Sequence, residues 1–204
     1  MRKYFFAIIS LVSGLSYYSC SHPKTIAEYK AWFNDQENGF IKTKEINNLI
    51  FSVQYRPVDL FLSGELDPGK TYTDKELDSL REGYRGSKYF VLEIAIQDKE
   101  VRDKNGLLEK ELFLNAFSGK ANTIASNVKL AIDGDTISPS IFHEENGYEL
   151  GSRKRVLFAF PSQKSKDVFN MNFIYNDEIF NSSILNFGFE IDEDKVPELP
   201  ITLK

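Results

Sequence analysis

The sequence predicts a mainly β protein built as an antiparallel β-sandwich, with an N-terminal hairpin and one or two short helices. Three observations lead to this prediction. Apolar and polar residues alternate along many short segments, turn residues separate these segments, and few helical patterns lie between them. The 204 residues also include 17 Phe and 10 Tyr, and aromatic residues favour strands because a broad ring covers a pleated surface.

The N-terminal part, residues 26–87, is expected to pack on the sandwich as a helix, a hairpin and a second helix. The apolar spacing that follows Thr25, a good helix cap, predicts the first helix. Strand patterns cover 40–46 and 49–56, and the Asn-Asn pair between them suits a tight turn because asparagine tolerates positive φ. These elements predict one hairpin.

The rest of this part is expected to hold an edge strand and a capped helix. Residues 58–62 follow Pro57, which removes a backbone donor, and are therefore interpreted as an edge strand. Thr73 and Glu76 have the spacing of a capping box, in which each side chain accepts from a free amide of the other residue at the start of a helix. Gly83 is the expected end of this helix.

Residues 88–204 are expected to form the sandwich itself, with an immunoglobulin-like arrangement over about 88–192. Alternating apolar residues predict strands that begin near Lys88, Val156, Phe169 and Phe187. Two further strands are expected at 111–117 and 128–133. Turn signals lie at Asn105-Gly106, Asp133-Gly134, Asn146-Gly147 and Asn176-Asp177.

Residues 1–19 have the pattern of an export signal. Arg2 and Lys3 precede an apolar run that ends near Leu15, which is shorter than the ~20 residues needed to cross a bilayer. Cys20, the only cysteine, follows this run. The arrangement resembles a bacterial lipoprotein signal, in which the cysteine after the cleavage site receives a diacylglyceryl group. Tyr17 departs from the aliphatic residue usual at its position.

The resemblance implies a lipid anchor at Cys20 and a short tether over 20–25. An ordinary secretory signal with a chance cysteine, and an uncleaved anchor, are the alternatives. Ser21 stands where aspartate is the familiar signal for retention at the inner membrane, so the resemblance implies the outer membrane. Lipoproteins that are exported to the cell surface often carry an acidic cluster just after the cysteine, and no such cluster follows Cys20. A periplasm-facing position is therefore favoured over the cell surface.

The charge of the chain argues against two kinds of partner. Removal of Arg2 and Lys3 with the leader takes the formal net charge from -5 to about -7. Nucleic-acid binding is driven by clustered cations, so nucleic acid is not an expected partner. Electrostatic adsorption to an anionic bilayer is disfavoured in the same way. The N-terminal lipid is the expected means of membrane attachment.

The residues that carry chemistry form no recognisable catalytic or metal set. His143 is the only histidine of the expected core, so a His-Glu-x-x-His zinc motif lacks its second ligand. A serine triad would have this histidine as its only base, and the sequence has no Gly-x-Ser-x-Gly elbow. Glu93 is expected on the wet face of its strand. The sequence Asp133-Gly134-Asp135 is interpreted as a hairpin turn, because the later ligands of a calcium loop do not follow. We therefore expect no cofactor and no metal.

Two groups of side chains are candidates for binding a partner. Arg153, Lys154 and Arg155 form the densest basic cluster, although such a run can also protect the start of a strand from edge pairing. Trp32 is the other interaction candidate, and with Tyr55, Tyr84 and Tyr89 it could stack on sugars. A place in the core or on a sheet surface is the alternative for these rings.

Two short acceptor patterns concern modification. Asp78-Ser79-Leu80 and Asp135-Thr136-Ile137 resemble the O-glycosylation pattern of exported Bacteroidota proteins. The resemblance implies Ser79 and Thr136 as modified residues, and chance matches to so short a pattern are expected.

The stretches 32–39, 42–44 and 53–57 resemble those of uncharacterised Bacteroidota outer-membrane-type lipoproteins of about this length. The resemblance covers most of the mature chain and implies location and architecture, without a catalytic motif. Three functions follow as hypotheses. The first is a non-catalytic envelope lipoprotein that binds protein as an accessory of an outer-membrane or secretion assembly. The others are a small-ligand or glycan-binding lipoprotein and a hydrolase with dispersed carboxylates.

Overall fold

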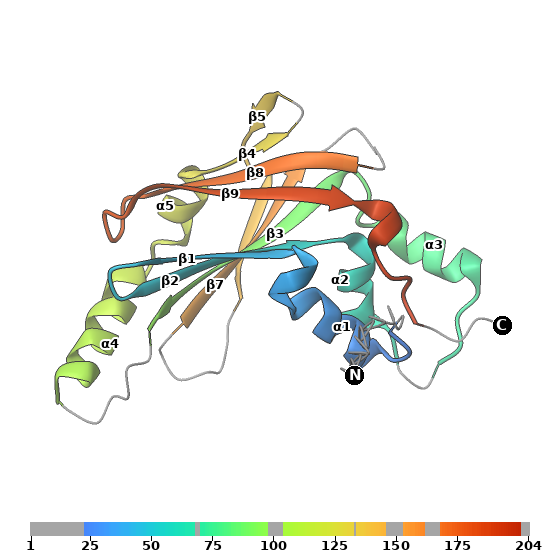
Figure 1. The fold of residues 1–204 in the computed structure, drawn as a ribbon, viewed down its shortest axis with the longest axis horizontal. Coiled ribbons are helices and arrows are strands. Elements are labelled where there is room, and N and C mark those ends of the chain that lie inside the picture. Colours follow the sequence, from blue (N-terminus) through green and yellow to red (C-terminus); the bar gives the residue numbers. More distant parts are fainter. Residues whose placement is uncertain are drawn as a thin grey trace, which may run out of the picture.

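Two antiparallel sheets face each other, and helices gather at the two ends of the pair (Figure 1). The computed structural model describes residues 23–67, 70–97, 104–132, 134–145, 153–161 and 168–200. The prediction of a mainly β, antiparallel sandwich is confirmed. The leader and residues 20–22 of the tether, Cys20 included, lie outside the described residues.

One sheet has five strands in the order β1-β2-β3-β7-β6, and the other has four in the order β5-β4-β8-β9. All pairings between the described strands are antiparallel. The strands are β1 (Ile41–Ile46), β2 (Leu49–Arg56), β3 (Ser87–Ile96), β4 (Val128–Ile132), β5 (Asp135–Ile137), β6 (Ile141–Glu145), β7 (Arg153–Pro161), β8 (Val168–Asp177) and β9 (Ser183–Asp192).

Aromatic rings from both sheets fill the space between them. The ring of Phe90 on β3 lies 5.5 Å from that of Phe173 on β8 and 5.5 Å from that of Phe189 on β9. Phe158 on β7 also reaches Phe173, at 5.9 Å. Alternation along each strand sends these residues inward, so the expected aromatic faces make the core.

The sandwich begins earlier in the chain than residue 88. β1 and β2 form the predicted hairpin, and Asn47 adopts a φ of 55° at its turn. This hairpin does not pack on the sandwich, because β2 pairs with β3 along its whole length and belongs to the same sheet. The strand order also differs from the ABED and CFG sheets of immunoglobulin domains, because β1, β2 and β3 are consecutive neighbours.

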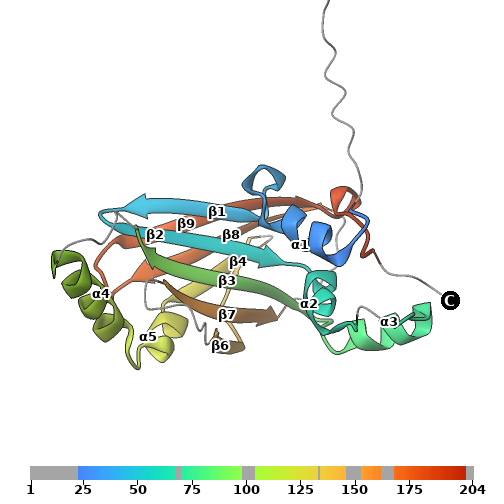
Figure 2. The same cartoon turned by 90° about the horizontal axis from the view of Figure 1, so that it is seen from below.

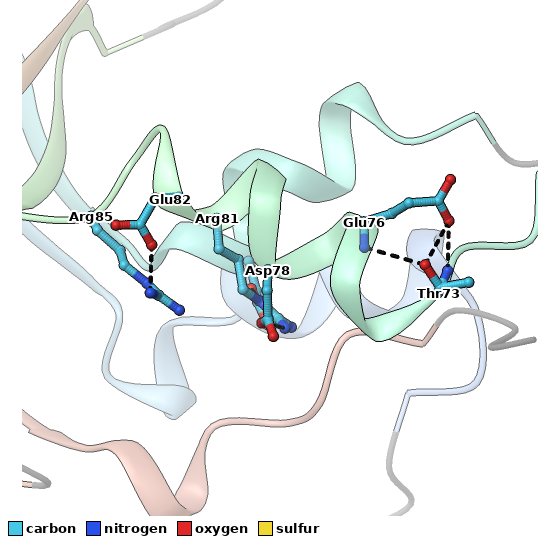
Figure 3. A network of polar contacts seen from close by, with 7 residues as sticks. Thr73, Glu76, Asp78, Arg81, Glu82 and Arg85 are labelled. Carbon is cyan, nitrogen blue, oxygen red and sulfur yellow. Dashed lines mark hydrogen bonds and ion pairs between the residues drawn. The ribbon is translucent and has the colours of Figure 1, made fainter.

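Both predicted helices are present. Helix α1 (Ile26–Asn34) starts at the Thr25 cap, whose side chain accepts from the amide of Glu28. Helix α3 (Asp74–Glu82) starts with the expected capping box, drawn in Figure 3. Thr73 donates its amide to the Glu76 carboxylate at 2.8 Å, and its side chain accepts from the Glu76 amide at 3.3 Å. The hydrogen bonds that Thr73 donates lower the pKa of the Glu76 carboxyl.

Two segments predicted as strands are helices. Residues 58–62 belong to α2 (Val58–Glu65), which starts directly after Pro57. Proline is tolerated at a helix start, where its missing N–H has no intrahelical partner. Residues 111–117 belong to α4 (Lys104–Phe117), where Phe113 and Phe117 lie four residues apart and are both buried. A short apolar run does not by itself distinguish the two structures.

The turn predictions have mixed outcomes. Gly134 has a φ of 92° between β4 and β5, as the Asp-Gly signal predicts. Asn105-Gly106 lies inside α4, so the turn expected there is wrong. Asp177 ends β8, and its loop follows directly. Asp133 and residues 146–147 lie outside the described residues.

The helices divide between the two ends of the sandwich. Figures 1 and 2 show α1, α2 and α3 at one end, and α4 with α5 (Ala121–Ser126) at the other. Short 3-10 turns follow α1 at Gln36–Asn38 and β9 at Glu193–Lys195. No helix among the described residues is long and apolar enough to cross a bilayer.

Candidate functional site: the outer face and edge of the five-stranded sheet

Arg153 and Arg155 of the basic cluster lie on the outer face of the five-stranded sheet, beside carboxylates of the neighbouring strands. Arg155 on β7 is the direct cross-strand neighbour of Glu93 on β3 and of Glu145 on β6. Its Nε lies 3.4 Å from a carboxylate oxygen of each. Arg153 also reaches Glu93, at 3.8 Å. Glu93 is thus on the polar face, as expected, and helps to neutralise the arginines.

Lys154 lies on the other face of β7, because it pairs with the buried Ile94 and stands two residues before the buried Val156. Its Nζ lies 3.1 Å from the Glu144 carboxylate on β6. β7 is not an edge strand, because β3 and β6 pair with its two sides. Among the described residues, however, β6 pairs with β7 only from Arg155 onward, so protection of the start of β7 remains an alternative role for this run. Its charges also join three adjacent strands.

The ion pairs continue to Arg56 at the end of β2. Its Nη1 lies 3.0 Å from the Glu145 carboxylate, and its Nε donates to the Gln54 side chain at 3.0 Å. Gln54 in turn donates to the carbonyl of Phe33 and to the Asn34 side chain. Burial lowers the pKa of the Arg56 guanidinium, and the Glu145 carboxylate counteracts this effect. The network therefore connects α1 to the far strand β6.

The aromatic candidates pack on protein rather than forming an open sugar-binding surface. The rings of Tyr84 and Tyr89 lie 5.7 Å and 4.7 Å from that of Phe61. The Tyr84 hydroxyl donates to Glu65, which raises the pKa of Tyr84 to about 12. Tyr55 is only 4% exposed. These contacts favour the structural alternative for the three tyrosines.

Trp32 packs at the end of the sandwich. Its ring lies 5.0 Å from that of Phe33 and 5.4 Å from that of Phe40. The indole is partly buried against the core, so the contacts again favour a structural role.

The other predicted positions lie apart from this network. Ser79 on α3 and Thr136 on β5 are both exposed, as a modified residue must be. His143 lies in the middle of β6 and is exposed. No three His, Cys, Asp or Glu side chains are grouped to hold a metal within the described ranges.

The sequence did not single out the edge strand β6, which presents two exposed apolar side chains. Ile141 is 66% exposed and Phe142 is 38% exposed. In the described part of the chain, β6 pairs with β7 only, so its second side has no neighbouring strand. The available signal was an apolar pair directly after Ser138-Pro139-Ser140, a turn-like sequence that separates it from β5.

No protein-family model, curated protein or solved structure matches this chain.

Proposed function

We propose that this chain is a lipid-anchored, non-catalytic protein of the bacterial cell envelope whose sandwich binds a protein partner through β6. The observation that carries the proposal is the exposed apolar edge formed by Ile141 and Phe142. An extended segment of a partner can add a strand to such an edge, because backbone hydrogen bonds join the two chains. The protein would act as an accessory of an outer-membrane or secretion assembly.

The contrast with the other sheet edges supports this choice. Natural proteins protect edges by making them short or by placing charged side chains on them. β5 has three residues, and β1 carries Lys42, Lys44 and Glu45. The remaining edge strand, β9, contacts β1 of the other sheet. β6 presents an isoleucine and a phenylalanine instead. Because the cations beside β6 are held by Glu93, Glu144 and Glu145, the ion pairs favour the edge itself as the binding surface.

An anchor at Cys20 would lie toward the end of the sandwich that is opposite the binding edge. Five residues separate Cys20 from Ile26, the first residue of α1, so the two Cα atoms can be at most about 20 Å apart. An acylated Cys20 would hold the α1 end close to the bilayer. β6 contacts α5, which lies at the opposite end, so a partner at β6 would not compete with the membrane (Figure 2).

Changing Cys20 to serine is expected to release the protein from membranes. Serine cannot receive the thioether-linked diacylglyceryl group, and each buried acyl CH₂ contributes roughly 0.8 kcal/mol to anchoring. Fractionation of the native host should move most of the chain from the membrane pellet to the soluble fraction, and the wild-type N-terminal peptide should carry the mass of the lipid. An unmodified Cys20 in the wild type would contradict the anchor.

Changing Ile141 to lysine is expected to reduce partner binding by about tenfold. A charge placed on the edge disfavours the addition of a strand, and the side chain is exposed enough for the fold to tolerate it. The measurement is quantitative mass spectrometry of proteins photo-crosslinked to position 143 in intact cells. Ile184→Lys is the matched control, because Ile184 is 62% exposed on β9 of the other sheet.

One crosslinked protein should be depleted by Ile141→Lys and retained in the Ile184→Lys control. Equal recovery in both variants, or no crosslinked protein in the wild type, would count against β6 as the binding edge. Fractionation of the Cys20→Ser variant is a separate experiment. The lipid anchor at Cys20 and partner binding at β6 can therefore each be contradicted without affecting the other.

A further inference from the structure

Gly188 lies in the middle of β9, on the solvent-facing side of the four-stranded sheet. Burial alternates along this strand from Ile184 to Ile191, and Phe187 and Phe189 on either side of the glycine are 1% and 2% exposed. A Cβ added to Gly188 would meet no atom within 4 Å, and the φ angle is outside the range that only glycine adopts readily. A larger residue would therefore fit.

Glycine in a strand interior weakens the strand and commonly marks a bulge, a close backbone approach or a ligand. A bulge is excluded, because β8 and β9 keep one register through all the pairs from Val168↔Asp192 to Asp177↔Ser183. Within the described part of the chain, the open space where a Cβ would stand also excludes a close protein neighbour. The open space beside the glycine favours access for a ligand as the reason for it.

The surroundings of Gly188 form an open hollow of about 720 Å³. Its polar lining is Asn170 and Asn172 of β8, Glu190 of β9 and Lys42 of β1, and Ala131 of β4 also lines it. Asn172 is the cross-strand neighbour of both Gly188 and Ala131, so the two small residues flank it in one row. The Asn172 amide donates to the Asn186 side chain at 3.0 Å, which positions it beside the hollow.

The lining selects for a hydroxyl-rich ligand. Each asparagine amide offers a donor and an acceptor, Glu190 adds acceptors and Lys42 adds donors. Sugar hydroxyls also donate and accept, so they match this set. The side chains of Met171 and Phe189, which also line the hollow, are buried in the core, so the surface offers hydrogen bonds rather than an aromatic face. We propose that the Gly188 hollow is a glycan-binding site.

The test fills the hollow without disturbing the fold. Gly188→Thr in the full mature chain should keep or raise the melting temperature, because a β-branched residue suits a strand. Wild type and variant are probed on a printed panel of neutral, amino-sugar and uronic-acid oligosaccharides, and the best ligand is titrated by calorimetry. The variant should lose at least about tenfold in affinity.

The double variant Asn170→Ala/Asn172→Ala should lose affinity by a similar factor. It provides the test if the Gly188→Thr variant does not fold. Ile184→Thr is the control on the same sheet face, outside the lining, and should bind like the wild type. Binding of Gly188→Thr equal to wild type, or a wild-type chain that binds no oligosaccharide of the panel, would overturn the proposal. Neither result bears on β6, which lies on the other sheet.

Discussion

Replacing Phe90 with alanine is expected to lower the free energy of unfolding by about 4 kcal/mol. The ring is fully buried and lies between the two sheets. It contacts Phe160 of its own sheet at 5.8 Å, and Phe173 and Phe189 of the other sheet at 5.5 Å each. Alanine leaves a cavity bordered by rigid rings, which cannot close it without losing their own contacts.

This loss of stability is measured by urea denaturation, with circular dichroism as the signal of unfolding. Phe90→Leu should lower the free energy of unfolding by less than Phe90→Ala, because leucine keeps most of the buried volume. Ile184→Thr serves as a surface control and should stay within about 0.5 kcal/mol of the wild type. A Phe90→Ala variant as stable as this control would show that the two sheets do not share the tight core described above.

Replacing Asp177 with alanine is expected to lower the free energy of unfolding by about 3 kcal/mol. The carboxylate is 3% exposed and organises the loop between β8 and β9. Its Oδ1 accepts from the amides of Ile179 and Phe180 and from the Tyr175 hydroxyl, each at 3.1 Å, and its Oδ2 accepts from the Ser182 amide at 3.0 Å. Alanine would leave these donors without their acceptor.

The melting temperature of the Asp177→Asn variant should fall between those of Asp177→Ala and the wild type. Its single oxygen can keep the contacts of Oδ1, whereas its NH₂ group cannot accept from Ser182. Glu178→Ala is the neighbouring control, because Glu178 is exposed. Thermal unfolding of the three variants gives the order directly. An Asp177→Ala variant with the same melting temperature as Glu178→Ala would contradict a supporting role for the Asp177 carboxylate.

Local sequence patterns predicted much of the fold and little of the candidate site. Thr73 and Glu76 predicted a helix start because both partners of a capping box lie within four residues. The Asn-Asn turn predicted its hairpin for the same reason. The strands expected at 58–62 and 111–117 were wrong, because short apolar runs fit either a strand or a helix until packing against the core selects one.

The site depends on residues that are far apart in the chain. The cluster at Arg153 was visible as a basic run, but its meaning changed once β3 and β6 placed Glu93 and Glu145 beside it. The exposure of Ile141 depends on which strand ends the sheet. Gly188 could have been noticed as a break in a strand pattern, yet only the register of β8 and β9 excludes a bulge.

The sequence by itself determined the mainly β class, the capped helices, the inward-facing aromatic residues and the prediction of a lipid site at Cys20. Each depends on periodicity or on neighbours within a few residues, and these are properties of the local chain. The tertiary structure decided the strand order, the pairing of the basic cluster and which edge stays open. Those features arise from contacts between distant segments, whose partners no local pattern specifies.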